Sequence, residues 1–257
     1  MITRILVFSV IGFLQLMRSR MYLNVLVAGA ALVAVALGVD ELSAGQADRV
    51  LINVGLGLIS LIVAVLAVVT GVGTITREIE SKQIHLVLAR PVRRAEIVLG
   101  RFVTIALLVV FANIILGVTL ALTITLVDGE GAGRALFAAV FSSFEGFIVA
   151  AIAIFFGTSS SSTVSTLFTT TLFLLGRLSP LLHDLILRGK FSPPLSTLLD
   201  WIYVALPHFF RFDLSAWARG QGALVGAELA QSLAYGSLYV VALLAFATWK
   251  LERRDLL

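Results

Sequence analysis

Long apolar blocks are the feature that most constrains how this chain can fold. They are separated by short polar stretches, and each is near the length of about 20 residues that a helix needs to cross a bilayer. Hydrophobic residues make up 59% of the 257 residues and charged residues only 13%, whereas soluble domains carry roughly 25% charge. The pattern excludes an ordinary soluble domain. It predicts an all-α, polytopic membrane protein that forms a single transmembrane domain over residues 1–257.

Six of the blocks are expected to form transmembrane helices. They cover residues 21–39, 51–75, 102–127, 135–157, 163–182 and 230–249. Residues 1–20, which precede them, are amphipathic with arginines at both ends, a pattern typical of a helix lying in the membrane interface. The alternative for residues 1–20 is the frayed start of the first span.

One segment, residues 76–101, concentrates charge in a chain that otherwise avoids it. After a mixed-charge start, three aliphatic residues at helical spacing indicate one apolar face, and a proline then ends that helix. The pattern fits a loop that grips a soluble partner, and it equally fits a basic loop that only fixes topology. The candidate contact residues are Arg77, Glu78, Glu80, Ile84, Val87, Leu88, Arg90, Pro91, Arg93 and Arg94.

The order of residues in this segment resembles the cytosolic segment of type-2 ABC exporter permeases. In that family a glutamate, a leucine-rich helix, a Pro-Val-x-Arg turn and a Gly-Lys pair recur in this order. Here they are matched by Glu78, residues 86–90, residues 91–94 and residues 100–101. Lys82 stands where glycine is common and an arginine ends the Gly-Lys pair, so both departures keep the segment basic.

This resemblance implies a non-catalytic membrane subunit of an ATP-driven exporter. Such permeases pair as homodimers or close heterodimers, with the translocation pathway at their interface. They work with two copies of a separate ATPase, which binds the ATP and Mg²⁺, so no cofactor is expected in this chain. Residues 77–90 would be the coupling helix that enters a cleft on the ATPase. Residues 206–213 resemble the branch of the family named for multicopper-enzyme maturation.

The distribution of basic residues predicts the orientation of the chain. With six spans, 12 of the 19 lysines and arginines fall on the side of the two termini and residues 76–101, and 7 fall on the other side. The positive-inside rule then places both termini in the cytosol, in the cytoplasmic (inner) membrane of a bacterium or archaeon. We therefore attribute the net charge of +4 to basic residues that orient the chain in the membrane and contact lipid headgroups, and we expect no nucleic-acid partner.

Residues 183–229 would then face outward, as an extracytoplasmic loop. An apolar patch within them predicts one or two short re-entrant helices that dip into the outer leaflet. Aromatic residues of this kind settle at the headgroup level of a membrane. Those in the loop are Trp201, Tyr203, Phe209, Phe210, Phe212 and Trp217.

Glu145 is a carboxylate inside the fourth predicted span. A charge at membrane depth is costly, which makes it a functional candidate that could line a transport pathway. The alternative is a structural hydrogen bond to neighbours such as Ser142 or Ser143. Arg177, near the outer end of the fifth span, is expected to extend toward the headgroups, and its pairing with Glu145 is left open.

Other chemistry finds little support in the sequence. There is no cysteine, the three histidines are scattered, and no G-x-x-x-x-G-K-[ST] loop is present, so we expect neither a metal site nor ATP binding in this chain. A lipid-modifying membrane enzyme would need an acidic or histidine cluster at a membrane face, and none stands out. A membrane anchor that recruits an ATPase for mechanical or assembly work shares every feature of the exporter permease and stays open.

Overall fold

The structure is a computed structural model, and it describes residues 2–18, 27–29, 31, 47–80, 94–126, 130–188 and 193–253. These residues form helices without any strand, which confirms the all-α prediction for the described part of the chain. Four helical segments are long and apolar enough to cross a membrane: Arg49–Thr74, Ala95–Leu126, Ala132–Gly157 and Gly226–Arg253. They correspond to the second, third, fourth and sixth predicted spans. The first predicted span, residues 21–39, lies almost wholly outside the described residues.

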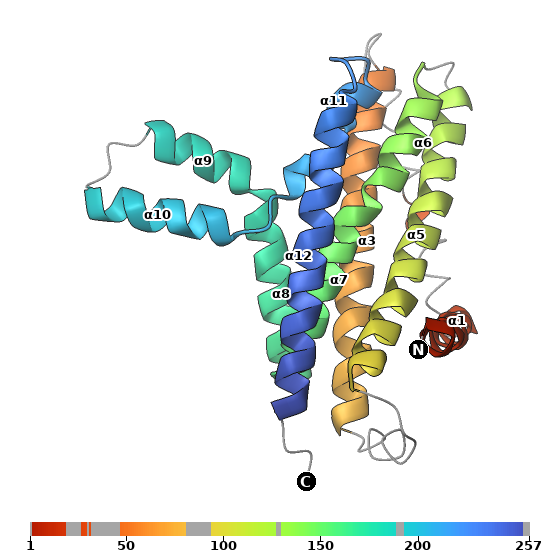
Figure 1. Ribbon diagram of the computed structural model, residues 1–257. Coiled ribbons are helices and arrows are strands. Elements are labelled where there is room, and N and C mark those ends of the chain that lie inside the picture. The colour runs from red at the N-terminus through yellow and green to blue at the C-terminus, as the bar shows by residue number, and fades with distance from the viewer. Residues whose placement is uncertain are drawn as a thin grey trace.

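Two long helices run side by side through the bundle (Figure 1). These are α3 (Ala47–Glu80) and α5 (Arg94–Leu126), of 34 and 33 residues. At 1.5 Å per residue each is about 50 Å long, well beyond the roughly 30 Å of hydrocarbon in a bilayer. They approach closely at Gly55, where a Cβ atom would lie 2.5 Å from the side chain of Leu120. A glycine at this contact lets the two helices pack without a gap.

The fourth span is built from two consecutive helices, α6 (Ala132–Phe141) and α7 (Ser143–Gly157), with a turn at Ser142. The α7 helix occupies the centre of the bundle, and every residue from Ile148 to Ile154 is buried. Its neighbours include α3, α5, α8 and α12. A helix that is apolar all round is expected at such a position, because it has no face that meets water.

The last helix, α12 (Gly226–Arg253), packs on the bundle through one stripe only. The residues of this stripe recur every three or four positions and are buried: Ser232, Gly236, Val240, Leu244, Ala247 and Leu251. The opposite face exposes large apolar side chains, including Leu238, Val241 and Phe246. In a membrane-spanning helix, such a face suits lipid or a second membrane subunit.

The N-terminal helix α1 (Ile2–Arg18) lies across the lower half of α5 and appears nearly end-on in Figure 1. The hydroxyl of Ser9 donates a hydrogen bond to the Gly100 carbonyl at 3.1 Å. Beside it, the ring of Phe13 meets that of Phe111 edge to face at 5.9 Å. The predicted helix is therefore present and docked on α5, while its position in the membrane interface stays a prediction.

The fifth predicted span differs from expectation. The helix that begins there, α8 (Ser162–Arg177), has 16 residues, or about 24 Å, which is shorter than the bilayer core. The chain turns at Leu178 and continues as α9 (Ser179–Arg188), which projects sideways from the bundle (Figure 1). Pro180 explains the break, because proline has no backbone N–H to bond the carbonyl of residue 176, yet it is tolerated in the first turn of a new helix.

The chain returns to the bundle through three further short helices. The α10 helix (Pro193–Ala205) runs back beside α9 and is followed by the 3-10 helix η1 (Phe209–Phe212) and by α11 (Ser215–Ala218). The prediction that all the aromatic residues of this loop sit at the headgroups is wrong for two of them. Phe209 and Phe212 are fully buried, and Phe212 stacks on Phe144 of α7 at 6.2 Å between ring centroids.

Candidate functional site

The two ends of the predicted coupling segment lie at one end of the bundle. In α3, Arg77, Glu78 and Glu80 lie in about the last turn, and Arg94 is the first residue of α5. Both helix ends lie at the same end of the molecule as the C-terminal end of α12 (Figure 1). The remaining candidates of the segment lie outside the described residues: Ile84, Val87, Leu88, Arg90, Pro91 and Arg93. Their role in coupling stays a prediction.

Glu145 is the most deeply buried charged side chain of the site, with 2% of the residue exposed. It lies in the first turn of α7, where the helix dipole favours an acidic side chain. Its carboxylate accepts a hydrogen bond from the hydroxyl of Ser60 at 2.9 Å. The same carboxylate accepts from Nη1 of Arg177, at 2.9 Å to Oε1 and 3.2 Å to Oε2. Glu145 thus ties α7 to both α3 and α8.

The alternative in which the Glu145 side chain bonds to Ser142 or Ser143 is not the one that the structure shows. Both serines bond instead to Asn113 of α5. The Asn113 amide N–H donates to the Ser143 hydroxyl at 3.1 Å, and the Ser142 hydroxyl donates to the Asn113 amide oxygen at 3.2 Å. The Glu145 carboxylate contacts Ser60 of α3 and Arg177 of α8. The alternative that had been left open, pairing with Arg177, is the one that the structure bears out.

Arg177 ends α8 and lies between two carboxylates at different depths. Besides Glu145, its Nη2 atom lies 3.7 Å from Oδ2 of Asp213, and the Asp213 side chain is 37% exposed. The other oxygen of Asp213 accepts a hydrogen bond from the backbone N–H of Ser215 at 3.0 Å. The Arg177 side chain is itself 31% exposed. It was expected to extend toward the lipid headgroups, but its guanidinium contacts carboxylates of the protein instead.

The space beside this ion pair is small. The cavity that borders Ser60, Glu145, Arg177 and Asp213 has a volume of about 10 Å³. One water molecule needs roughly 10–15 Å³ of such space, so the cavity holds at most about one water. In this conformation the pair joins helices and does not line an open pathway.

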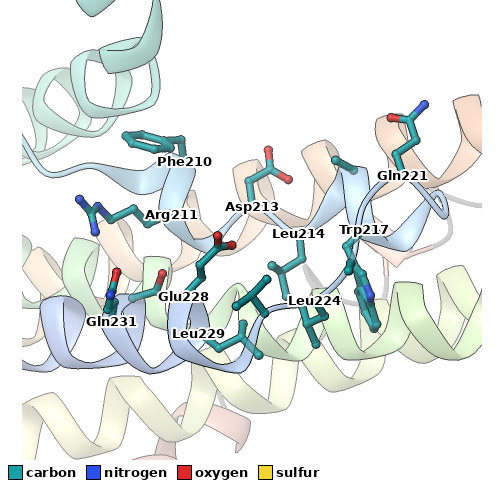
Figure 2. A pocket seen from close by; sticks show the side chains of 14 residues that line it. Phe210, Arg211, Asp213, Leu214, Trp217, Gln221, Leu224, Glu228, Leu229 and Gln231 are labelled. Atoms are coloured by element: carbon teal, nitrogen blue, oxygen red, sulfur yellow. The ribbon is translucent and has the colours of Figure 1, made fainter.

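A larger pocket of about 400 Å³ opens next to it (Figure 2), between η1, α11 and the first turns of α12. Asp213 borders both this pocket and the small cavity at the ion pair. Figure 2 shows Arg211 and Gln231 on one side of the pocket and Trp217 on the other, with Glu228 between them. Its volume is within the range of ligand pockets, and Asp213 can be reached from it.

Within the part of the chain that the structure describes, no group of three or more histidine, aspartate or glutamate side chains is placed to hold a metal ion. Sequence reasoning had not singled out Ser60 or Asn113, and Asp213 had entered only as the last residue of the 206–213 resemblance. Asn113 carried a usable signal, since an amide in the middle of an apolar span needs a hydrogen-bond partner. Ser60 carried none, because serine is common in membrane helices.

Comparisons with known proteins address the family of the chain. Residues 2–256 match a family described as ABC-2 family transporter protein. No curated protein matches the chain. The family match covers nearly the whole chain, and so includes the long helices, the segment between α3 and α5, and the outer helices. It does not separate branches of the family, so the assignment to the multicopper-maturation branch stays a prediction.

Proposed function

Because this chain belongs to the ABC-2 family of transporter proteins, we propose that it is the permease subunit of an ATP-driven ABC exporter. The observation that carries the proposal is the family match over residues 2–256 of a helical chain with four segments able to cross a membrane. The family supports a non-catalytic membrane subunit in preference to a lipid-modifying enzyme. Export, in preference to import, rests on the resemblance in the cytosolic segment alone.

The ATPase would dock at the end of the bundle where α3 and α5 meet the segment between them. The α3 helix continues six residues beyond its apolar span, from Thr74 to Glu80, and these residues are mostly polar. In this proposal Ile84, Val87 and Leu88 form the apolar anchor of a coupling helix, and the charges around them set its orientation. ATP and Mg²⁺ would be bound by the ATPase, in two copies.

A second permease copy, in a homodimer or close heterodimer, would complete the pathway. Two features support this. The cavity at the ion pair of one chain is too small for cargo, and α12 has an exposed apolar face, with only 17% of its span buried inside the chain. A dimer interface along such a face would place the pathway between two chains.

The proposed location is a bacterial or archaeal cytoplasmic membrane, with both termini in the cytosol. The end of the bundle where α3 ends and α5 begins, which also holds the C-terminal end of α12, would face the cytosol, because basic residues concentrate in the sequence between α3 and α5 and near the termini. The pair α9 and α10 would then lie toward the outer leaflet, where exposed Trp201 suits the headgroup level.

A membrane anchor that uses an ATPase for mechanical or assembly work, without moving cargo, is the second candidate. The small cavity at the ion pair is compatible with it, as it is with an exporter whose pathway lies between two chains. A transport assay in vesicles that contain the permease and its ATPase would separate the two functions. Cargo movement driven by ATP supports the exporter, whereas ATP turnover without movement of any offered cargo supports the anchor.

The decisive experiment for the common part of both proposals is isolation of the chain from its native membrane with its partners. We expect an ATPase subunit to co-purify, and we expect the chain freed of that subunit to hydrolyse no ATP. Robust ATP hydrolysis by a preparation shown to lack any ATPase subunit would contradict the assignment.

A further inference from the structure

The helices α9 and α10 form a hairpin that leaves the bundle sideways (Figure 1). They pack on each other, and the main contacts of the hairpin with the rest of the described chain run through α8 and η1 at its base. The orientation of the whole hairpin therefore depends on how the end of α8 and the start of η1 are held. Small movements at this base would be amplified along the two helices.

The two chain segments at the base are pressed together by packing. A Cβ atom at Gly176 would lie 2.5 Å from the carbonyl oxygen of Pro207 and 2.7 Å from the ring of Phe209. Phe209 is fully buried and packs on Phe173 of α8, with 5.5 Å between ring centroids. The chain that enters the hairpin and the chain that leaves it thus contact each other directly.

We propose that Glu145, Arg177 and Asp213 form a latch that sets the orientation of the α9–α10 hairpin against the transmembrane core. Arg177 is the positioning residue, because it directly precedes the turn at Leu178 where the hairpin begins. Through Glu145 it is tied to α7 and, by way of Ser60, to α3. Through Asp213 it is tied to the segment by which the chain leaves the hairpin.

The two halves of the latch differ in strength for a physical reason. The Glu145 half is buried and hydrogen-bonded, so dissolved salt screens it little. The Asp213 half spans 3.7 Å between partly exposed groups, and such pairs are weak and salt-sensitive. Arginine suits the central position because its planar fork can contact two carboxylates at once, which the single ammonium group of lysine does poorly.

Arg211, which lies in η1, provides a control of equal charge. The guanidinium of Arg211 lies over the ring of Tyr235, 5.2 Å from its centroid, and borders the 400 Å³ pocket. It has the same charge as Arg177 but does not join the latch. Neutralising Arg211 changes the net charge of the chain by the same amount and leaves Glu145 and Asp213 with their partner.

The test uses the absence of cysteine from the full-length chain. Two cysteines are introduced in one chain, by Val50→Cys in α3 and Leu198→Cys in α10, and each carries a spin label. Both positions are exposed. The distance distribution between them is measured by pulsed electron paramagnetic resonance in lipid nanodiscs. Chains that carry one label only are measured in parallel, so that distances between two copies of the chain can be subtracted.

We expect a narrow distribution for the unmodified latch, a broadened or shifted one for Arg177→Gln, and a narrow one for Arg211→Gln. Arg177→Lys should give an intermediate width. An unchanged distribution in Arg177→Gln would overturn the proposal, because packing at Gly176 alone would then hold the hairpin. Equal broadening in Arg177→Gln and Arg211→Gln would also overturn it, since the effect would follow charge and not the latch.

If Arg177→Gln does not yield folded protein, the Asp213→Asn variant tests the latch in its place, because it leaves the buried pair of Arg177 and Glu145 intact. We expect partial broadening, which high salt should reproduce in the unmodified chain. No broadening with Asp213→Asn or with salt would overturn the two-carboxylate latch. The measurement needs neither the ATPase nor cargo, so its failure is distinct from a failure of the proposed transport function.

Discussion

The guanidinium of Arg177 lies 2.9 Å from the carboxylate of Glu145, although 32 residues separate them in the chain. The pair links α8 to α7. The hydroxyl of Ser60, in α3, donates to the same carboxylate, so three helices meet at Glu145. Charges are costly within a membrane domain unless each finds a partner. The contact therefore explains how both charged side chains are accommodated in segments that are otherwise apolar.

The first prediction concerns the asymmetry of this pair. Removing the arginine leaves Glu145, which is 2% exposed, with only Ser60 as a partner, and breaking a buried pair in this way costs about 3–5 kcal/mol. Glu145→Gln leaves a partly exposed Arg177 that still has Asp213, so its cost should be smaller. We therefore expect the purified Arg177→Gln protein to have a lower thermal unfolding temperature than the Glu145→Gln protein.

The double variant provides the control for that prediction. If the two side chains act as a pair, Arg177→Gln combined with Glu145→Gln should cost less than the sum of the single changes. Additive effects would mean that the pair has no coupling energy. A Glu145→Gln protein with unchanged stability but lower ATPase turnover in the complex would instead assign Glu145 to the transport pathway.

A second prediction concerns Gly176. Its Cβ position lies 2.5 Å from the backbone carbonyl oxygen of Pro207, and a backbone atom cannot move aside as a flexible side chain can. Gly176→Ala should therefore lower the thermal unfolding temperature and separate α8 from the segment before η1. Gly57→Ala is the matched control in a membrane helix, because nothing lies within 4 Å of that Cβ position. Equal stability of the two variants would contradict this close contact.

The third prediction tests the proposed coupling helix. Val87→Asp, or Leu88→Ala, should reduce the amount of ATPase that co-purifies with the chain, while the chain itself still inserts and purifies. Loss of one large aliphatic from a packed contact costs on the order of 2–5 kcal/mol, which weakens association by at least about tenfold. Recovery of ATPase equal to that of the unchanged protein would identify residues 76–101 as a loop that only fixes topology.

The control for this prediction must be exposed and lie far from the coupling segment. Phe212 is unsuitable despite its place in the outer segment, because it is fully buried and its removal would disturb the bundle. Phe210, which is 41% exposed, meets the requirement. We expect Phe210→Ala to leave ATPase recovery unchanged.

Charge reversal at the rim of the coupling segment makes a fourth prediction. Glu78→Lys and Arg94→Glu should weaken ATPase association, and the loss should depend on salt, because rim charges act through screened electrostatics. Co-purification at low and high ionic strength is the measurement. A loss that is the same at both ionic strengths would point to misfolding of the helix ends in place of an altered charge contact.

The fifth prediction concerns orientation. The α11 helix and the C-terminal end of α12 lie at opposite ends of the bundle (Figure 1), and Gln221, three residues after α11, is exposed. A single cysteine at Gln221 should react with a membrane-impermeant maleimide added to intact cells, whereas a cysteine at Lys250 should react only after the membrane is opened. The reverse pattern would place the termini outside the cytosol.

Part of this architecture was predictable from the sequence because it depends on local properties. Hydropathy over about 20 residues identified the four segments that the structure shows to be long and apolar enough to span a membrane. The break after α8 was also encoded locally, by Pro180, but an apolar average over residues 163–182 obscured it. The family was recognisable from the order of residues between α3 and α5, and the match over residues 2–256 agrees with it.

The sequence by itself determined that the chain is helical, apolar enough for a membrane, and basic in the segment between α3 and α5. Only the tertiary structure decided that Glu145 pairs with Arg177 and that Phe209 and Phe212 are buried in the bundle. The physical reason is that lipid and protein core are both apolar. Hydropathy therefore reports that a side chain leaves water, but the packing of distant helices decides which partner it meets.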